Sequence, residues 1–381
     1  MQVDEVVFST LLANSVAGTY VDYERALITK VIKFANLEYL ARRGDIPYSL
    51  FFSPLPVAQA QVAAKTKKLL AGVNKDTFQI GSREKVSLRD IELIVKDLMR
   101  KQELLKKHDS SLTRNAIVGI LRKPGVSVEA DAARLAAALG IDREELWACR
   151  TKEKALELMI GRLEASQILV SRSVQNYMPQ RLTHVAFSGV TVRDAKVPYI
   201  FLAGGDHADH QEPVGRTIFT LALMVVLIAR RIFAPVTWDA ESLGVGLGCE
   251  YDIAAAILMP GKAFNERSLE SLDDIKAAAE RFKVTPSAVT VRARRLGLIS
   301  HDMASSRLNE LRTEFRALPA KKGMSQIRPE NAVRKYAGGE LSRRMLRALD
   351  ARSISPREFC RTVCLNRLQP ERIQDLRRVL T

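Results

Sequence analysis

The spacing of hydrophobic residues along the chain predicts a mostly helical protein. Between residues 87 and 107, apolar side chains recur three or four positions apart, which is the period of one helix face; they are Ile91, Ile94, Val95, Leu98 and Leu105. The same spacing predicts helices over residues 31–44, 127–140, 142–150 and 152–166, and a helical pair over 340–368 that turns at 353–356.

Three short runs change to a different pattern. Residues 168–174, 183–192 and 197–205 are rich in β-branched and aromatic residues with polar interruptions, which indicates a small sheet of about three strands. We therefore expect an α+β fold that is mostly helical, with a sheet-and-helix core, a helix-turn-helix-like segment after it and a basic helical C-terminal region.

The most hydrophobic stretch is the unbroken apolar run 218–229, which Arg230 and Arg231 end. A helix needs about 20 apolar residues to cross a bilayer, so this run predicts a helix buried on all sides. A membrane-active element over residues 217–236 stays open as an alternative. A second, alanine-rich helix follows and stops at Pro260-Gly261.

Residues 270–299 have the pattern of a helix-turn-helix. The first helix is predicted to end near Phe282, and Thr285 with Pro286 forms a typical start for the second. Polar side chains on that second helix could contact bases or phosphates of DNA: Ser287, Thr290, Arg292, Arg294 and Arg295. The alternative, which we favour, is that this pair packs as scaffold through its valines and leucines.

An aromatic segment, IPYSLFFSPLP, lies between residues 46 and 56. Its prolines at 54 and 56 are expected to interrupt regular structure. Its aromatic side chains need burial or a partner, and we expect Tyr48, Phe51 and Phe52 to fill the core of their own domain.

The charge of the chain is uneven. Its 59 Lys and Arg exceed its 43 Asp and Glu by 16, and residues 301–381 hold 18 basic and 9 acidic residues. This excess suits an anionic partner such as nucleic acid, an acidic protein or an anionic membrane, although a solvated basic helix face would look the same. Four scattered cysteines exclude a disulfide scaffold, and the N-terminal residues lack a signal-peptide pattern, so we expect a cytoplasmic protein.

The order of these segments resembles the ImmA/IrrE family of metallopeptidases, in the long form met on phages and mobile elements. The matching pieces are FTLA at 219–222, AAAILMP at 254–260 and FKVTPSAVTVRARRLGLI at 282–299; the segment 46–56 resembles the one that follows the DNA-binding module. The resemblance covers most of residues 30–300. It implies a zincin-like core and four regions: N-terminal helices (1–110), a peptidase-like domain (111–265), the helix-turn-helix-like segment (266–300) and the C-terminal region (301–381).

The zinc motif of that family is absent from this chain. There FTLA precedes H-E-x-x-H, whereas here Leu223-Met224-Val225-Val226-Leu227 follows it. Leucine has no lone pair for a metal and methionine cannot take a proton from water. The third ligand of the family falls on Cys249, next to Glu250. We expect no catalytic residue and no cofactor; a relocated zinc site formed by His207 and His210 with Cys249 or Glu250 is the alternative.

The resemblance then implies a function without hydrolysis. We expect a catalytically inactive relative that binds a partner protein, namely a small helix-turn-helix repressor or antitoxin, as the toxin or regulatory half of a toxin–antitoxin or phage-defence pair. The former substrate groove, walled by residues 197–202, would be the binding surface. The alternatives are a DNA-binding regulator that uses the helix-turn-helix segment and a zinc metallopeptidase with a relocated metal site.

Overall fold

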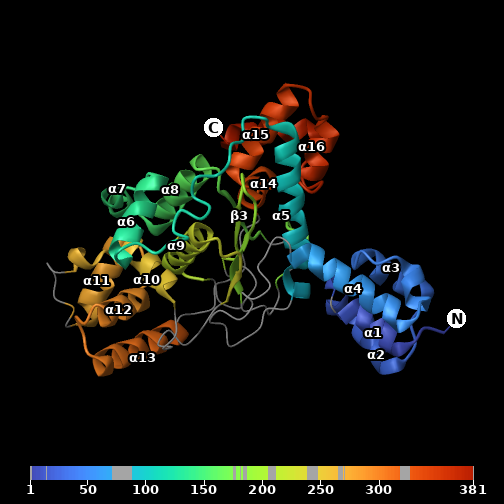
Figure 1. The fold of residues 1–381 in the computed structure, drawn as a ribbon, viewed down its shortest axis with the longest axis horizontal. Coiled ribbons are helices and arrows are strands. Elements are labelled where there is room, and N and C mark those ends of the chain that lie inside the picture. Colours follow the sequence, from blue (N-terminus) through green and yellow to red (C-terminus); the bar gives the residue numbers. More distant parts are fainter. Residues whose placement is uncertain are drawn as a thin grey trace.

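A small mixed sheet lies between two groups of helices, and a third group forms a separate N-terminal bundle (Figure 1). The protein is of the α+β class and mostly helical, as the sequence predicts. The computed structural model describes residues 2–13, 15–70, 88–174, 177–180, 182, 187–204, 212–237, 248–264, 269, 271–317 and 327–380.

Within these residues four strands form one sheet, with the order β1-β3-β2-β4. Strand β3 (Tyr199–Leu202) pairs in parallel with β1 (Leu169–Arg172) and antiparallel with β2 (Phe187–Val192), which also pairs with β4 (Pro235–Thr237). Alternate residues of β3 enter two different hydrophobic cores. The sheet is therefore covered on both faces, and β4 is a strand that the sequence pattern did not predict.

The first face of the sheet carries the helices of the predicted peptidase-like domain. They are α6 (Val128–Leu139), α7 (Arg143–Ala148), α8 (Lys152–Ala165), α9 (Val214–Arg230) and α10 (Cys249–Leu258). The same hydrophobic core continues into α11 (Leu272–Phe282), α12 (Pro286–Arg295) and α13 (His301–Ala317). The helix-turn-helix-like segment is thus part of one packed unit with the helices that cover the sheet.

The second face carries α5 (Leu88–His108) together with the C-terminal helices α14 (Pro329–Ala337), α15 (Gly339–Asp350), α16 (Pro356–Thr362) and α17 (Ile373–Leu380) (Figure 1). The five apolar residues predicted for one face of α5 are all buried in this core. A buried polar cluster joins α5 to α14. Asp97 of α5 accepts a 2.9 Å hydrogen bond from the hydroxyl of Tyr336 of α14, and it lies 2.8 Å from the ammonium nitrogen of Lys101 in its own helix. The C-terminal region therefore closes the sheet, and this core crosses the predicted boundary at residue 110.

The N-terminal bundle has a core of its own. It contains α1 (Glu5–Ala13), α2 (Val21–Thr29), α3 (Phe34–Arg43) and α4 (Leu55–Leu70). A buried carboxylate, Glu92 of α5, joins it to the rest: it accepts a 3.0 Å hydrogen bond from the backbone N–H of Val16 and lies 2.7 Å from the ammonium of Lys65. Figure 1 shows this bundle at one end of α5, away from the other helices.

The aromatic segment of this bundle differs from the expectation in two ways. The prolines do not interrupt the structure for long, since α4 begins at Leu55 and a proline is tolerated in the first turn of a helix. Of the three aromatic side chains, only Phe51 is buried in the core, whereas Tyr48 and Phe52 are 53% and 40% exposed. The prediction that all three fill the core is wrong for these two.

Candidate functional site

Helix α9 occupies the centre of the molecule. It packs against β2 and β3 on one side and against α8 and α10 on the others, and nearly all of its side chains are buried. The apolar side chains that predicted this helix are therefore buried against other parts of the protein on every side. Among the described helices, none has the length and hydrophobicity needed to cross a membrane.

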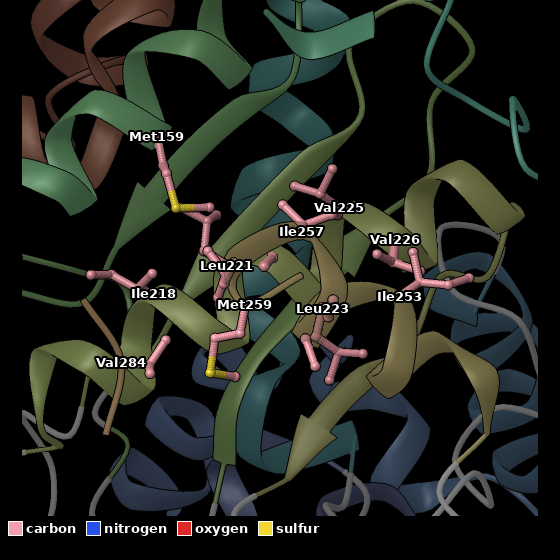
Figure 2. Close-up of a cluster of buried hydrophobic side chains, with 14 of the residues drawn as sticks. Met159, Ile218, Leu221, Leu223, Val225, Val226, Ile253, Ile257, Met259 and Val284 are labelled. Atoms are coloured by element: carbon pink, nitrogen blue, oxygen red, sulfur yellow. The ribbon is translucent and has the colours of Figure 1, made fainter. Parts of the chain in front are cut away.

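The positions at which the resembling family has zinc ligands and the catalytic glutamate lie inside this apolar centre. Leu223, Met224 and Leu227 are 2%, 0% and 7% exposed. Figure 2 shows Leu221 and Leu223 in the same group of apolar side chains as residues of α10. Met224 points at the sheet, where a Cβ built on Gly189 would lie far inside van der Waals contact distance of its methyl carbon. The centre is closed by close packing.

These residues do not fit a zinc ion. Zinc in proteins takes nitrogen, thiolate or carboxylate ligands, and a catalytic site also needs a position open to water. Leu223 and Leu227 offer only carbon and Met224 only a thioether sulfur, and all three side chains are buried among other apolar side chains. We therefore derive no hydrolytic step for this chain.

Cys249 and Glu250, where the resemblance would put the third zinc ligand, instead connect α10 to α9. Cys249 is the exposed first residue of α10, and its sulfur accepts a hydrogen bond from the guanidinium of Arg230 at the end of α9; Arg230 Nε also lies 3.6 Å from Glu250 Oε1. Partial burial, together with the Glu250 carboxylate, raises the pKa of the Cys249 thiol.

The alternative zinc site cannot be traced here, because His207 and His210 lie outside the described residues. In the part of the chain that is described, no three His, Cys, Asp or Glu side chains lie close enough together to hold a metal ion.

The helix-turn-helix-like segment has the predicted boundaries. Helix α11 ends at Phe282, Lys283 adopts the left-handed conformation, and Thr285 caps α12 by accepting a hydrogen bond from the N–H of Ala288. The turn packs directly on the start of α9, where a Cβ at Gly215 would clash with the backbone of Val284. Through these contacts the pair packs against the start of α9.

The three candidate arginines of α12 bind other parts of the same chain. Arg292 is 4% exposed; one of its terminal nitrogens lies 2.6 Å from Glu129 Oε1, and its Nε donates to the carbonyl oxygen of Met259 at 3.3 Å. Burial lowers the pKa of Arg292, and the carboxylate of Glu129 acts in the opposite direction. Arg295 lies 2.5 Å from Asp252 of α10, and Arg294 lies 3.0 Å from the ring of His301.

The two hydroxyl candidates of α12 differ in exposure. Thr290 is fully buried, and its hydroxyl donates to the carbonyl oxygen of Pro286 at 3.0 Å. Ser287 is half-buried. A duplex that approached α12 would therefore meet arginines that already have partners and only one accessible hydroxyl, which favours the scaffold interpretation.

Within the described residues, the strand at 199–202 lacks the free edge that the expected binding groove requires. Strand β3 lies inside the sheet with β1 on one side and β2 on the other, so it has no free edge to which a peptide could add. All four of its side chains are buried. The edge strands are β1 and β4. At β1, Gly338 packs so closely on the carbonyl oxygen of Val170 that a Cβ would clash.

An exposed apolar surface on the N-terminal bundle was not predicted. Of the twelve exposed large hydrophobic side chains in the described residues, nine lie between residues 6 and 57. Four lie around the turn between α2 and α3 and on the segment that follows α3, and we call them the N-terminal apolar surface: Ile28, Val31, Phe34 and Tyr48. The rings of Phe34 and Tyr48 meet edge to face, 6.1 Å apart between centroids. The sequence feature that could have indicated this surface is the aromatic segment 46–56, which contains Tyr48 and was expected to be buried.

We compared the chain with profiles of protein families, with curated proteins and with solved structures, and none of them matches it. The resemblance to the ImmA/IrrE family therefore remains a prediction based on short segments and their order.

Proposed function

We propose that this chain is a non-catalytic protein that acts by binding a partner protein. The observation that carries the proposal is the apolar packing at Leu223, Met224 and Leu227, where the resembling family would need two histidines and a glutamate. A centre filled in this way has neither a metal ligand nor a general base. Such a protein acts through the surfaces it presents.

The N-terminal apolar surface is our candidate for the partner contact. Phe34 and Tyr48 are about half exposed, at 51% and 53%, and aromatic anchors of this kind contribute much of the energy of protein interfaces. Lys33 beside them is exposed, and within the described residues its side chain has no ion-pair partner. The surface therefore suits an amphipathic helix with apolar anchors and an acidic rim.

The partner we propose is a small helix-turn-helix repressor or antitoxin, with this chain as the toxin or regulatory half of the pair. Small helical proteins of that class present amphipathic helices, whose apolar side chains could pack on the N-terminal apolar surface. The binding site proposed here replaces the groove beside β3.

The experiment is co-expression of the full chain with the product of the adjacent reading frame that encodes a small helix-turn-helix protein, followed by size-exclusion chromatography with light scattering. We expect a complex that Phe34→Asp with Tyr48→Asp abolishes. The matched control is Val126→Asp, a valine that is 98% exposed elsewhere on the molecule, and it should leave the complex intact. A complex that tolerates both substitutions in the bundle would contradict the proposed surface, and absence of a complex with the unaltered chain would contradict the proposed partner.

A further inference from the structure

Helix α16 and its flanking turns carry a group of arginines without partners. Arg352, Arg357, Arg361 and Arg367 are exposed, and within the described residues none of their side chains makes an ion pair or a hydrogen bond. We call these four side chains the α16 arginines. The other arginines of the C-terminal helices behave differently, since Arg344 and Arg372, for example, lie 2.7 and 2.8 Å from carboxylates.

The segment that carries the α16 arginines has a net positive charge. Between residues 352 and 367 the only acidic residue is Glu358, against four arginines. An excess of like charges on one segment produces a positive potential, which attracts an anionic partner. One more guanidinium lies nearby: Arg100 of α5 donates to the carbonyl oxygen of Thr362 at 3.2 Å, but it is also paired with Asp97 at 2.6 Å, so it adds little free charge.

The scaffold under these side chains is well anchored. Ser355 caps α16 by accepting a hydrogen bond from the N–H of Glu358, and Phe359 and Cys360 are buried in the core on the second face of the sheet. Arg357 and Arg361 are four residues apart, so they project from the same side of the helix. The arginines are thus presented on a fixed surface.

We propose that the α16 arginines bind the phosphate backbone of duplex DNA. The guanidinium group matches phosphate oxygens with two parallel N–H donors, which makes arginine well suited to this contact. Single-stranded nucleic acid is recognised largely by stacking of its bases on aromatic side chains. The one aromatic residue between 352 and 367 is Phe359, which is buried, so this surface favours a duplex.

The test measures binding of the full chain to a fluorescein-labelled 20-base-pair duplex by fluorescence anisotropy between 50 and 200 mM salt. The variant carries Arg352→Gln, Arg357→Gln, Arg361→Gln and Arg367→Gln. At 100 mM salt we expect its Kd to rise roughly tenfold or more, and the slope of log K against log salt to become shallower by about 3 to 4, since each phosphate contact contributes about 0.9.

A charge-matched control removes four exposed basic side chains elsewhere: Arg114→Gln, Arg122→Gln, Lys123→Gln and Lys154→Gln. It should change the Kd by less than about threefold, which separates a local site from general attraction by net charge. Circular dichroism checks that both variants are folded. An equal loss in the control, unchanged binding by the α16 variant, or no binding at 50 mM salt would overturn the proposal. So would tighter binding to a single-stranded RNA 20-mer or to phosphatidylserine vesicles than to the duplex.

Discussion

Helices α12 and α16 begin with the same local signal and use their arginines in opposite ways. Each has a hydroxyl residue as N-cap and a proline at its first position, Thr285-Pro286 in α12 and Ser355-Pro356 in α16. The arginines of α12 bind α6, α10 and α13, whereas those of α16 are exposed without partners in the described residues. Local sequence determines where both helices start, but tertiary neighbours determine which charges remain available.

The difference comes from residues far away in the chain. Glu129 lies 163 positions from Arg292, and Asp252 lies 43 positions from Arg295. A local sequence pattern therefore cannot predict these contacts. A buried guanidinium is stabilising only when its donors find acceptors, and α6 and α10 supply them. Within the described residues the arginines of α16 bind no such acceptor, and their side chains are exposed.

The largest expected effect separates the two helices by stability. Arg292→Met removes a buried guanidinium from Glu129 and from the carbonyl oxygen of Met259, and we expect the free energy of unfolding to fall by about 2–3 kcal/mol. The matched substitution Arg361→Met removes an exposed side chain that has no partner within the described residues. It should change the free energy of unfolding by less than about 0.5 kcal/mol. Urea denaturation followed by circular dichroism measures both. Equal losses would show that the arginines of the two helices are equally engaged.

A second expected effect concerns pH and the start of α15, the helix before α16. Burial raises the pKa of Glu164 to about 7, above the ordinary value of 4.5, although it accepts a hydrogen bond from the N–H of Glu340. The folded protein therefore holds a proton that the unfolded chain releases, so the free energy of unfolding should fall as pH rises from about 4.5 to 7, by on the order of 2 kcal/mol.

The control for this effect is Glu164→Gln, which keeps a carbonyl acceptor for the same N–H and does not titrate. Urea denaturation of this variant at pH 5 and pH 7.5 should show a smaller loss of stability than the unaltered chain. Burial also raises the pKa of Glu212 to about 7, and this residue is present in both proteins. We therefore expect the variant to keep part of the pH dependence of its free energy of unfolding. The same slope in both proteins would contradict the role of Glu164.

Much of the fold could be predicted from hydrophobic periodicity. The apolar stripe of α5, the buried α9 and the boundaries of α11 and α12 follow from residues that are close in sequence. Weak patterns were missed. In α13 only Ala304, Leu308 and Leu311 are buried in a mostly polar helix, and β4 is three residues long and begins with a proline. Neither pattern is strong enough to predict an element.

The candidate site was predicted less completely, because it depends on pairing and exposure. The burial of Leu223, Met224 and Leu227 is what the apolar run that contains them predicts. The interior position of β3 depends on strand order, which is set by contacts between distant residues. The exposure of Phe34 and Tyr48 likewise depends on how α2 and α3 pack, so aromatic content alone could not separate core from surface.

The central proposal is that a chain with this packed centre at α9 binds its partner without a zinc ion and without cleaving it. Its most direct test is the metal content of full chain purified without a metal-affinity tag, measured by inductively coupled plasma mass spectrometry, together with the intact mass of the co-expressed partner. We predict well under one zinc ion per chain and a partner of full mass. One zinc ion per chain, lost on His207→Ala with His210→Ala, together with a cleaved partner would contradict it.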